Sequence, residues 1–594
     1  MYRSIVILIL LVCLSCKKER DDTSYKIAFM ADVHFQDIYG SFSDSDYKGV
    51  LNPETNTYTL ARTMQSQLQS TRLFNENYFA FLSALDDIVS KNIKYVVLPG
   101  DFSDDGQMFN IKGLKHILKK YSEKHNIKFI LTTGNHDPVR PFYQEAGKYD
   151  FIGEGGKQQP IFSSKEIYRA KDSNALEPVF TKDIAKLGYE DILNELKDFG
   201  FYPKQNDVYW ETPFIDYNYE NYQFDKALKQ AELSNRNYKI PPFGSQIPDV
   251  SYLVEPTEGL WFLAIDANVY VPKDANSYSS ASVGYNNILS HKAHLMAWIK
   301  SVTQRAKKLN KKLIVFSHFP TVEFNDGASE NIRMLLGDDK MQLHRVPEDA
   351  VAKAFIEAGV KVHFGGHMHI NDTGVTTFES GSLVNVQIPS LAAYIPAYKI
   401  ATVSADEVEI ETVVIDNVHR FKEFFPLYKQ EYAFMKSKME NVLWDSTILN
   451  AKTYKDLTQS HLKGLINNRF LEKDWDIPFT TFLLSLTKNS VAEFVSINEN
   501  TMEGFEDWTG FEMLFDLYRL RSADTLAFQD IGEKRVEIYK KIIEAYLIHF
   551  KSISAPSEIE NDFLQFCLIF KKFLNGAPSD NFIINLNTNQ LISK

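Results

Sequence analysis

Five short clusters of histidine, aspartate and asparagine are the residues in this 594-residue sequence that could carry chemistry. Imidazole nitrogen and carboxylate oxygen are ligands that suit zinc, iron and manganese, and an amide oxygen can bind a cation without adding charge. A carboxylate can also bridge two cations, and Asp101 is the candidate for that role. The residue types therefore predict a centre of two divalent metals (Mn, Fe or Zn). The clusters are Asp32-Val33-His34, Gly100-Asp101, Gly134-Asn135-His136-Asp137, Ser317-His318 and Gly366-His367-Met368-His369.

Buried strands are the elements that must position these clusters. Apolar runs typical of strands end just before them, and helical periodicity lies between several of the runs. Strands that alternate with helices favour an α/β core, where ligands bind outside the carboxyl ends of the strands. In each pair spaced by one residue, an extended backbone would point both side chains the same way. The apolar runs are residues 25–31, 95–98, 129–132, 313–316 and 360–364.

In order and content, the five clusters resemble the signature of the calcineurin-like metallophosphoesterases. The resemblance covers roughly residues 25–415, and it implies a two-sheet sandwich flanked by helices. It further implies that Asp101 bridges two metals, that His136 stands near the leaving group and that Asp137 orients His136. The closest likeness is to bacterial proteins similar to cyclic-nucleotide phosphodiesterases. The resemblance assigns Asp32, His34 and His369 to the first metal and Asn135, His318 and His367 to the second.

The reaction implied is hydrolysis of a phosphoester, and we expect a phosphodiester. Two metals roughly 3.5–4 Å apart polarise the phosphoryl oxygens and supply hydroxide that attacks phosphorus in line. A positioned histidine then protonates the leaving alkoxide, and His136 is the candidate. The alternative for His136 is a third ligand on the second metal.

Three other polar residues lie near or between the clusters. His363 lies on a predicted strand, and we expect it to be structural. Asp105 is expected to support the site without binding metal. Arg140 follows the third cluster closely and is a candidate for contacting the substrate phosphate; an ion-paired surface position is the alternative.

Two segments depart from the α/β pattern. An aromatic-rich insertion spans about residues 139–258, and we expect most of its rings to form a local core. Helical spacing dominates residues 417–575 and predicts an all-helical C-terminal domain outside the catalytic site. The predicted organisation is a signal peptide (1–15), a lipidated tether (16–24), the phosphoesterase domain (25–415) and the helical domain (416–594).

The N-terminus predicts export. A short apolar run, too short to span a bilayer, ends in Leu14-Ser15-Cys16 and resembles the lipobox of bacterial lipoproteins. Lipidation of Cys16 would anchor the protein to a membrane of the bacterial cell envelope; the alternative is a signal peptide cut nearby without lipidation. The net charge of −12 disfavours general nucleic-acid binding, because phosphate backbones are held mainly by Lys and Arg. We therefore expect a small phosphoester substrate; the sequence indicates no oligomeric state.

Two other functions remain open. The same metals could serve a phosphomonoesterase, a nucleotidase or a lipid phosphodiesterase, because the metal cluster recognises only the phosphate. A different class would be a surface lipoprotein that binds a partner through its helical domain and keeps an inactive core. Loss of a ligand would favour that function, and no ligand is missing from the sequence.

Overall fold

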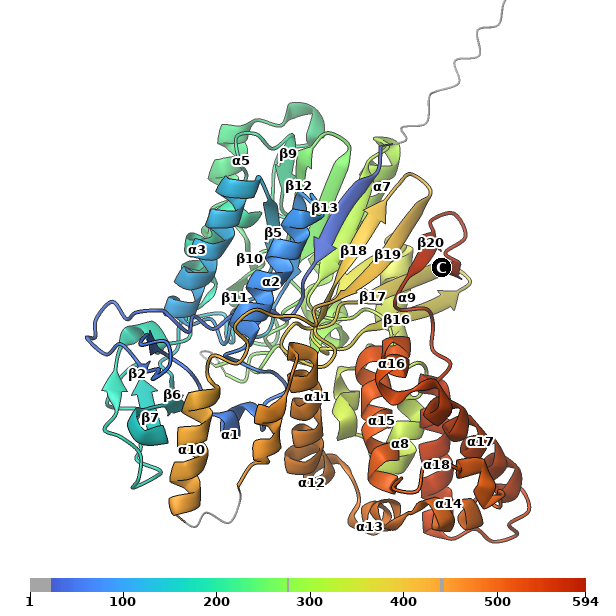
Figure 1. Ribbon diagram of the computed structural model, residues 1–594. Coiled ribbons are helices and arrows are strands. Elements are labelled where there is room, and N and C mark those ends of the chain that lie inside the picture. The colour runs from blue at the N-terminus through green and yellow to red at the C-terminus, as the bar shows by residue number, and fades with distance from the viewer. Residues whose placement is uncertain (1–22, 275–276, 439–442) are drawn as a thin grey trace, which may run out of the picture.

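The computed structural model describes residues 23–274, 277–438 and 443–594. Its centre consists of two seven-stranded sheets that face each other, with helices on the outside (Figure 1). The rings of Phe29 and Phe364, one from each sheet, stack with their centroids 4.1 Å apart. The two-sheet α/β sandwich predicted from the sequence is therefore confirmed.

The first sheet mixes parallel and antiparallel strands. β1, β4 and β5 run parallel, whereas β18 pairs with β1 in the antiparallel direction. Helix α3 (Met108–His125) packs against β5 on the outside of this sheet. In spatial order the strands are β21 (Leu591–Ser593), β20 (Phe582–Asn585), β19 (Glu407–Val414), β18 (Ala397–Val403), β1 (Tyr25–Phe29), β4 (Tyr95–Pro99) and β5 (Lys128–Thr132).

The second sheet has a parallel centre formed by β13, β14, β15 and β17. Helices α7 (Ala293–Lys308) and α9 (Asp349–Glu357) pack against β14 and β17, respectively. In spatial order the strands are β16 (Asp372–Phe378), β17 (Gly381–Gln387), β15 (Val362–Gly365), β14 (Lys312–Ser317), β13 (Leu260–Ile265), β12 (Tyr252–Thr257) and β9 (Tyr209–Glu211).

The aromatic-rich insertion contributes to this sheet as well as forming structure of its own. β6 (Gly147–Ile152), β7 (Gln158–Phe162) and β8 (Val179–Phe180) make a separate small sheet. β9 and β12 instead extend the second large sheet. Because Tyr209, Trp210 and Tyr252 are fully buried there, these rings are core residues.

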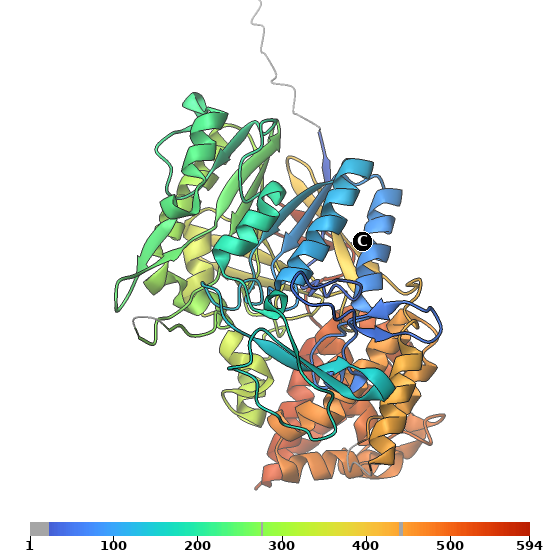
Figure 2. The same ribbon diagram turned by 90° about the vertical axis from the view of Figure 1, so that its left-hand side faces the viewer.

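Helices fill most of the C-terminal region, and they pack on a core of their own below the sandwich (Figure 1). That core also takes in residues from α8 (Ser329–Leu336) of the α/β part, which contacts α18. The main helices are α10 (Phe425–Ser437), α11 (Tyr454–Leu465), α13 (Ile477–Ser485), α15 (Gly510–Ala523), α17 (Glu533–Phe550) and α18 (Glu558–Phe573). The short helix η1 (Glu154–Gly156), between β6 and β7, contacts α10, so the insertion lies beside the start of the helical region (Figure 2).

The last residues correct the prediction of an all-helical domain. After α18 the chain returns to the sandwich and forms β20 and β21, so that β20 pairs with β19 at the edge of the first sheet (Figure 1). Phe582 and Ile584 alternate with more exposed neighbours and are fully buried, which is the period-two pattern of a strand. Helical spacing was found only over residues 417–575, and the predicted helical domain was extended to residue 594 without recognising this short strand.

The expected signal peptide and the lipobox cysteine, Cys16, lie outside the described residues. Within the described ranges, no helix is long and apolar enough to cross a membrane.

Candidate dinuclear metal site

All five sequence clusters lie just beyond the carboxyl ends of strands from the two facing sheets. Asp32 and His34 follow β1, Asp101 follows β4, and Asn135 follows β5 in the first sheet. His318 follows β14 and the His367–His369 pair follows β15 in the second sheet. Because the two sheets face each other, their strand ends deliver side chains to one place.

Left-handed backbone turns aim these side chains. The φ angles are +50° at Asp32, +42° at His34, +48° at Asp101, +75° at His367 and +57° at His369. Such conformations cost a non-glycine residue of order 1–3 kcal/mol and cluster at functional sites. The expectation of extended backbone within each pair is therefore wrong, and sharp turns make the side chains converge.

Asp32, His34 and His369 form the first group of potential ligands. Their ligand atoms all lie within 4.8 Å of one another. His34 Nε2 lies 3.0 Å from His369 Nε2, and Asp32 Oδ1 lies 3.4 Å from His369 Nε2. The carbonyl of Thr71 holds the other ring nitrogen of His369 at 3.3 Å. This hydrogen bond leaves Nε2 facing the group.

Asp101, His318 and His367 form the second group, and Asn135 joins it. His318 Nε2 lies 3.2 Å from Asp101 Oδ2, 3.3 Å from Asn135 Oδ1 and 3.1 Å from His367 Nδ1. The carbonyl of Pro99 contacts His318 Nδ1 at 3.1 Å. Asp101 Oδ2 also lies 3.8 Å from His34 Nε2 of the first group. Asp101 therefore stands between the two groups, as its predicted bridging role requires.

The residues present fit divalent cations. Ring nitrogens face one another across about the length of a hydrogen bond, and Asp32 Oδ1 is buried with no hydrogen-bond partner. Burial, with neighbouring positive charges, lowers the pKa of His34 and of His367 well below its ordinary value. Neutral imidazole is the form that binds metal. Which cation binds is not indicated, and the individual ligand assignments stay predictions.

His136 lies beside the two groups, forms a third group of potential metal ligands with His34 and Asp101, and is held by Asp105. Its Nε2 is 4.0 Å from Asp101 Oδ2, and its Nδ1 is 2.6 Å from Asp105 Oδ1. Lys148 and Lys186 approach the other Asp105 oxygen at 2.9 and 3.3 Å. Although burial opposes it, these lysines hold the pKa of Asp105 well below its ordinary range.

Asp137 occupies a different position from the one that the resemblance implied. Its carboxylate is fully buried and accepts hydrogen bonds from the backbone amides of Ser103, at 3.2 Å, and Gly134, at 3.4 Å. It therefore fastens the loops after β4 and β5 to each other. The structure places Asp105, rather than Asp137, against the ring of His136; Asp105 agrees with the supporting role expected for it.

At two positions of the site the backbone passes so close to a carboxylate that only glycine fits. A Cβ at Gly134 would overlap the carboxylate of Asp101, and a Cβ at Gly366 would overlap that of Asp32. The backbone can pass these carboxylates only without a side chain.

His363 and Arg140 do not belong to the groups of potential ligands, and the contact of Arg140 with the substrate phosphate stays a prediction. Two arginines that were not predicted act on the site. His363 is buried and bonds Ser317 and Asn385, as expected of a structural residue. Arg140 donates to the carbonyl of Val139. Arg72 donates to Asp104 at 2.8 Å and acts electrostatically on His34. Arg345 acts on His367 and on Asp101. Neither Arg72 nor Arg345 belongs to a sequence cluster, so spacing gave no signal for them.

The family model described as calcineurin-like phosphoesterase matches residues 25–224, which contain the first three clusters. Over these residues the chain matches the calcineurin-like phosphoesterase family. His318, His367 and His369 lie beyond the matched segment, and the fold brings them to the same centre. The family and the two groups of potential metal ligands identify the chain as a metal-dependent phosphoesterase.

The solved structures to which the chain is similar are distant from it. A dimetal phosphatase from Danio rerio is 12% identical, with 65% of this chain and 95% of that chain covered and a TM-score of 0.33. GAP50, described as the anchor in the inner membrane complex of Plasmodium, is 12% identical, with coverages of 66% and 84% and a TM-score of 0.26. No curated protein matches the chain.

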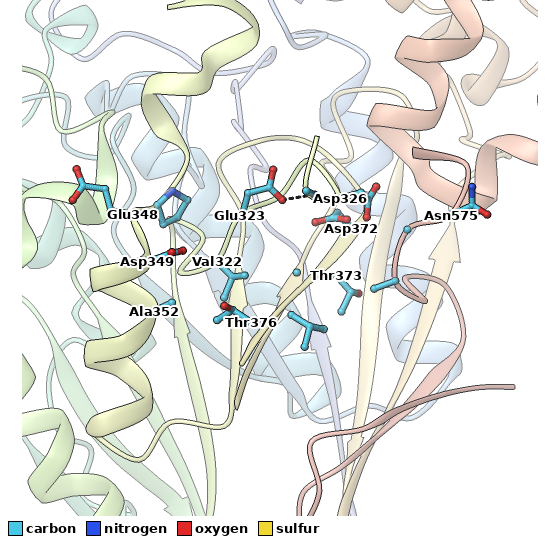
Figure 3. A pocket seen from close by; sticks show the side chains of 16 residues that line it. Val322, Glu323, Asp326, Glu348, Asp349, Ala352, Asp372, Thr373, Thr376 and Asn575 are labelled. Carbon is cyan, nitrogen blue, oxygen red and sulfur yellow. Dashed lines mark hydrogen bonds between the residues drawn. The ribbon is translucent and has the colours of Figure 1, made fainter. Parts of the chain in front are cut away.

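A separate cavity of about 410 Å³ is lined by carboxylates and contains none of the predicted metal ligands. Figure 3 shows Asp326 and Asp372 next to each other in it, near Glu323. Burial and the neighbouring carboxylates of Asp524 and Glu323 raise the pKa of Asp326 to about 8. The cavity also touches Asn575 and Gly576, so it lies where the C-terminal segment meets the α/β part.

Proposed function

We propose that this phosphoesterase hydrolyses phosphodiesters at a centre of two divalent cations. The observation that carries the proposal is the position of Asp101 between two groups of ligands, with His136 beside them. When bound, two such cations polarise the phosphoryl oxygens and lower the pKa of a water to about 7. The remaining chemistry belongs to the side chains of the protein.

His136 is positioned to move a proton. With 26% of its side chain exposed, it is the most open histidine of the site. Asp105 accepts a hydrogen bond from Nδ1 and fixes the ring, so that Nε2 is the nitrogen that can protonate a leaving alkoxide. A diester always releases an alcohol, and an alkoxide leaving group needs such a proton.

Three of the four other histidines of the site are held in fixed orientations, whereas Nδ1 of His34 has no hydrogen-bond partner among the described residues. Backbone carbonyls of Thr71, Pro99 and Ser282 hold the outer nitrogens of His369, His318 and His367. Partners of this kind fix the tautomer and the orientation of metal-binding histidines. The site therefore needs little rearrangement to hold its cations.

Turnover of matched chromogenic esters tests the proposal. The metal-reconstituted protein should show a higher kcat/KM for bis(p-nitrophenyl) phosphate than for p-nitrophenyl phosphate. Cyclic nucleotides, nucleotides and glycerophosphodiesters then define the natural leaving group. A preference for the monoester would instead support the phosphomonoesterase alternative. No turnover of any ester by fully metal-loaded protein would support the inactive, partner-binding alternative.

We also propose that the enzyme works in the bacterial cell envelope, held by a lipid on Cys16. Support comes from the lipobox-like sequence before Lys17.

A further inference from the structure

Three arginines lie where the helical C-terminal region meets the loops that hold the metal ligands. Arg345 ends the short helix η7 (Lys340–Arg345), Arg469 lies in the π-helix η9 (Ile466–Phe470) and Arg521 lies in α15. Arg521 Nη2 donates to the carbonyl of Met341 at 3.3 Å, which joins α15 to η7. The region predicted to stand apart from the catalytic site thus supplies two of the three cations.

Hydrogen bonds connect these arginines to the metal-binding loops. Arg469 Nη1 donates to the carbonyl of Gln69 at 3.1 Å, two residues before Thr71, whose carbonyl holds His369. Next to Arg521, the carbonyl of Ser522 accepts from the backbone amide of Asn371 at 2.9 Å, two residues after His369. Both C-terminal arginines therefore approach segments that directly flank one ligand.

Electrostatic interactions link the three arginines with the carboxylates of the metal site. Burial lowers the pKa of Arg345 to about 10; Asp101 and Asp32 oppose that effect, whereas Arg469 and Arg521 add to it. Arg345 is thus coupled electrostatically both to the predicted bridging carboxylate and to the two other arginines.

These guanidinium groups are partly buried and bond neutral acceptors: Arg345 donates to the side-chain oxygen of Gln342 at 2.6 Å, and Arg469 and Arg521 donate to backbone carbonyls. Within residues 23–274, 277–438 and 443–594, no salt bridge reaches Arg345, Arg469 or Arg521, and Nε of Arg345 and of Arg521 is buried without a hydrogen bond. Asp474 acts on Arg521 from a distance without pairing with it. By contrast, Arg519 on the same helix pairs with Asp516 at 2.8 Å. Asp101, Asp32 and Asp474 act on these arginines electrostatically without pairing with them. Neighbouring guanidinium groups that lack salt bridges among the described residues are suited to receive an anion.

We propose that Arg345, Arg469 and Arg521 bind a second phosphate of the substrate whose phosphodiester lies at the metal centre. The inference rests on the proposed function and names its substrate class: phosphodiesters that carry a further phosphate group. Planar guanidinium forks bind phosphate oxygens through paired hydrogen bonds, which suits this role better than lysine would. The helical region would then select substrates, while the sandwich performs the hydrolysis.

A matched pair of chromogenic substrates tests this subsite. Thymidine 5′-(p-nitrophenyl phosphate) and its 3′-phosphorylated form have the same leaving group and differ by one phosphate. The wild-type enzyme should have a lower KM for the phosphorylated form. Arg345→Gln and Arg521→Gln should each reduce that advantage, the ratio of the two KM values, by roughly 10-fold or more, the usual cost of losing a charged hydrogen bond.

Arg333→Gln is the control, because Arg333 is 44% exposed on α8 and paired with Glu330. This variant should behave as the wild type on both substrates, and Arg345→Lys should retain part of the preference. Thermal unfolding would show whether any variant is misfolded. Equal KM values for the two substrates in the wild type, or a preference that persists in Arg345→Gln, would overturn the subsite.

Binding of inorganic pyrophosphate to the metal-free protein provides a readout that does not depend on turnover. Calorimetry should show binding that weakens in Arg345→Gln and Arg521→Gln but not in Arg333→Gln. If the metal-loaded enzyme turned over neither nucleotide substrate, the proposed function would fail. The calorimetric measurement would still test whether the arginines bind phosphate. Pyrophosphate binding that is identical in all variants would refute the subsite.

Discussion

Substitution of His136, which Asp105 holds, should change the hydrolysis rate in a way that depends on the leaving group of the ester. His136→Ala should keep both metals, because the two ligand groups are complete without it. It should slow alkyl or nucleoside esters by about 100-fold to 10,000-fold, the usual contribution of a general acid. Nitrophenyl esters should slow much less, because nitrophenolate leaves without a proton. Metal content and rates on a matched alkyl and aryl pair check this.

Asp105→Asn should also slow alkyl or nucleoside esters more than nitrophenyl esters, but by a smaller factor than His136→Ala. The reason is that the ring of His136 loses its charged partner. Asp137→Asn should not have this effect, since Asp137 contacts backbone amides instead. Equal losses on both ester types with depleted metal in His136→Ala would instead make His136 a metal ligand.

Asp101 is the residue on which both metals are expected to depend. Its carboxylate lies 3.2 Å from His318 and 3.8 Å from His34, one from each group. Asp101→Ala should therefore lower metal occupancy at both positions, whereas Asn135→Ala should affect mainly one. Elemental analysis of the purified variants measures this. Two full equivalents of metal in Asp101→Ala would contradict the bridge.

At the scale of residues, sequence alone identified the groups that converge but not how they are aimed. Histidine and carboxylate types with strand-end spacing were enough to place His318 beside Asp101. The left-handed turns at Asp32 and His34 were not predicted: Asp and His adopt this conformation more often than most other side chains, but still in a minority of cases, so residue type alone does not locate it. The arginines were missed because Arg345 and Arg521 are brought near by packing alone.

The contribution of strand β20 to the stability of the fold can be measured with a single substitution. Phe582→Ala removes a fully buried ring at the edge of the first sheet and should lower the free energy of unfolding by about 3–5 kcal/mol. Ile592→Ala in β21 is the control, because that side chain is 51% exposed. Denaturant unfolding of the full chain measures both. Equal stability of the two variants would show that β20 does not support the sheet.

At the scale of elements, long periodic segments were predictable and short ones were not. The parallel strands before each cluster and the helices between residues 425 and 573 followed their apolar periodicity. β20 has only 4 residues, and its pairing with β19 depends on packing more than 160 positions away in the chain. A chain truncated near residue 416 would lose this strand and leave β19 as an unpaired edge.

The carboxylate-lined cavity should affect the stability of the whole molecule through pH. Asp326 has its pKa raised from an ordinary 3.8 to about 8, so the folded state binds its proton more tightly than the unfolded state. This contribution is fully present below about pH 4 and is lost as the pH rises towards 8, by up to about 1.4 kcal/mol per pH unit. Asp326→Asn should therefore flatten the fall of the melting temperature between pH 5 and pH 8. An unchanged slope would show that Asp326 titrates normally.

The predicted lipid on Cys16 determines where the whole molecule should be found, namely in the membrane fraction. Cys16→Ser should release the protein from the membrane fraction, because the lipid-bearing thiol is absent. Fractionation with salt and carbonate washing measures this, and Ser15→Ala serves as a control that keeps a small residue before the cysteine. A variant that stays membrane-bound after washing would point to another anchor.

The pairing of β20 with β19 has a consequence for biosynthesis. β1, at the other side of β18, emerges from the ribosome hundreds of residues before β20 completes the same sheet. Until then β19 is an open edge, a form that invites pairing with another chain. Glu407, Glu409 and Glu411 project from that edge strand away from the core. Their like charges are suited to keep nascent chains apart while they wait for their final strand.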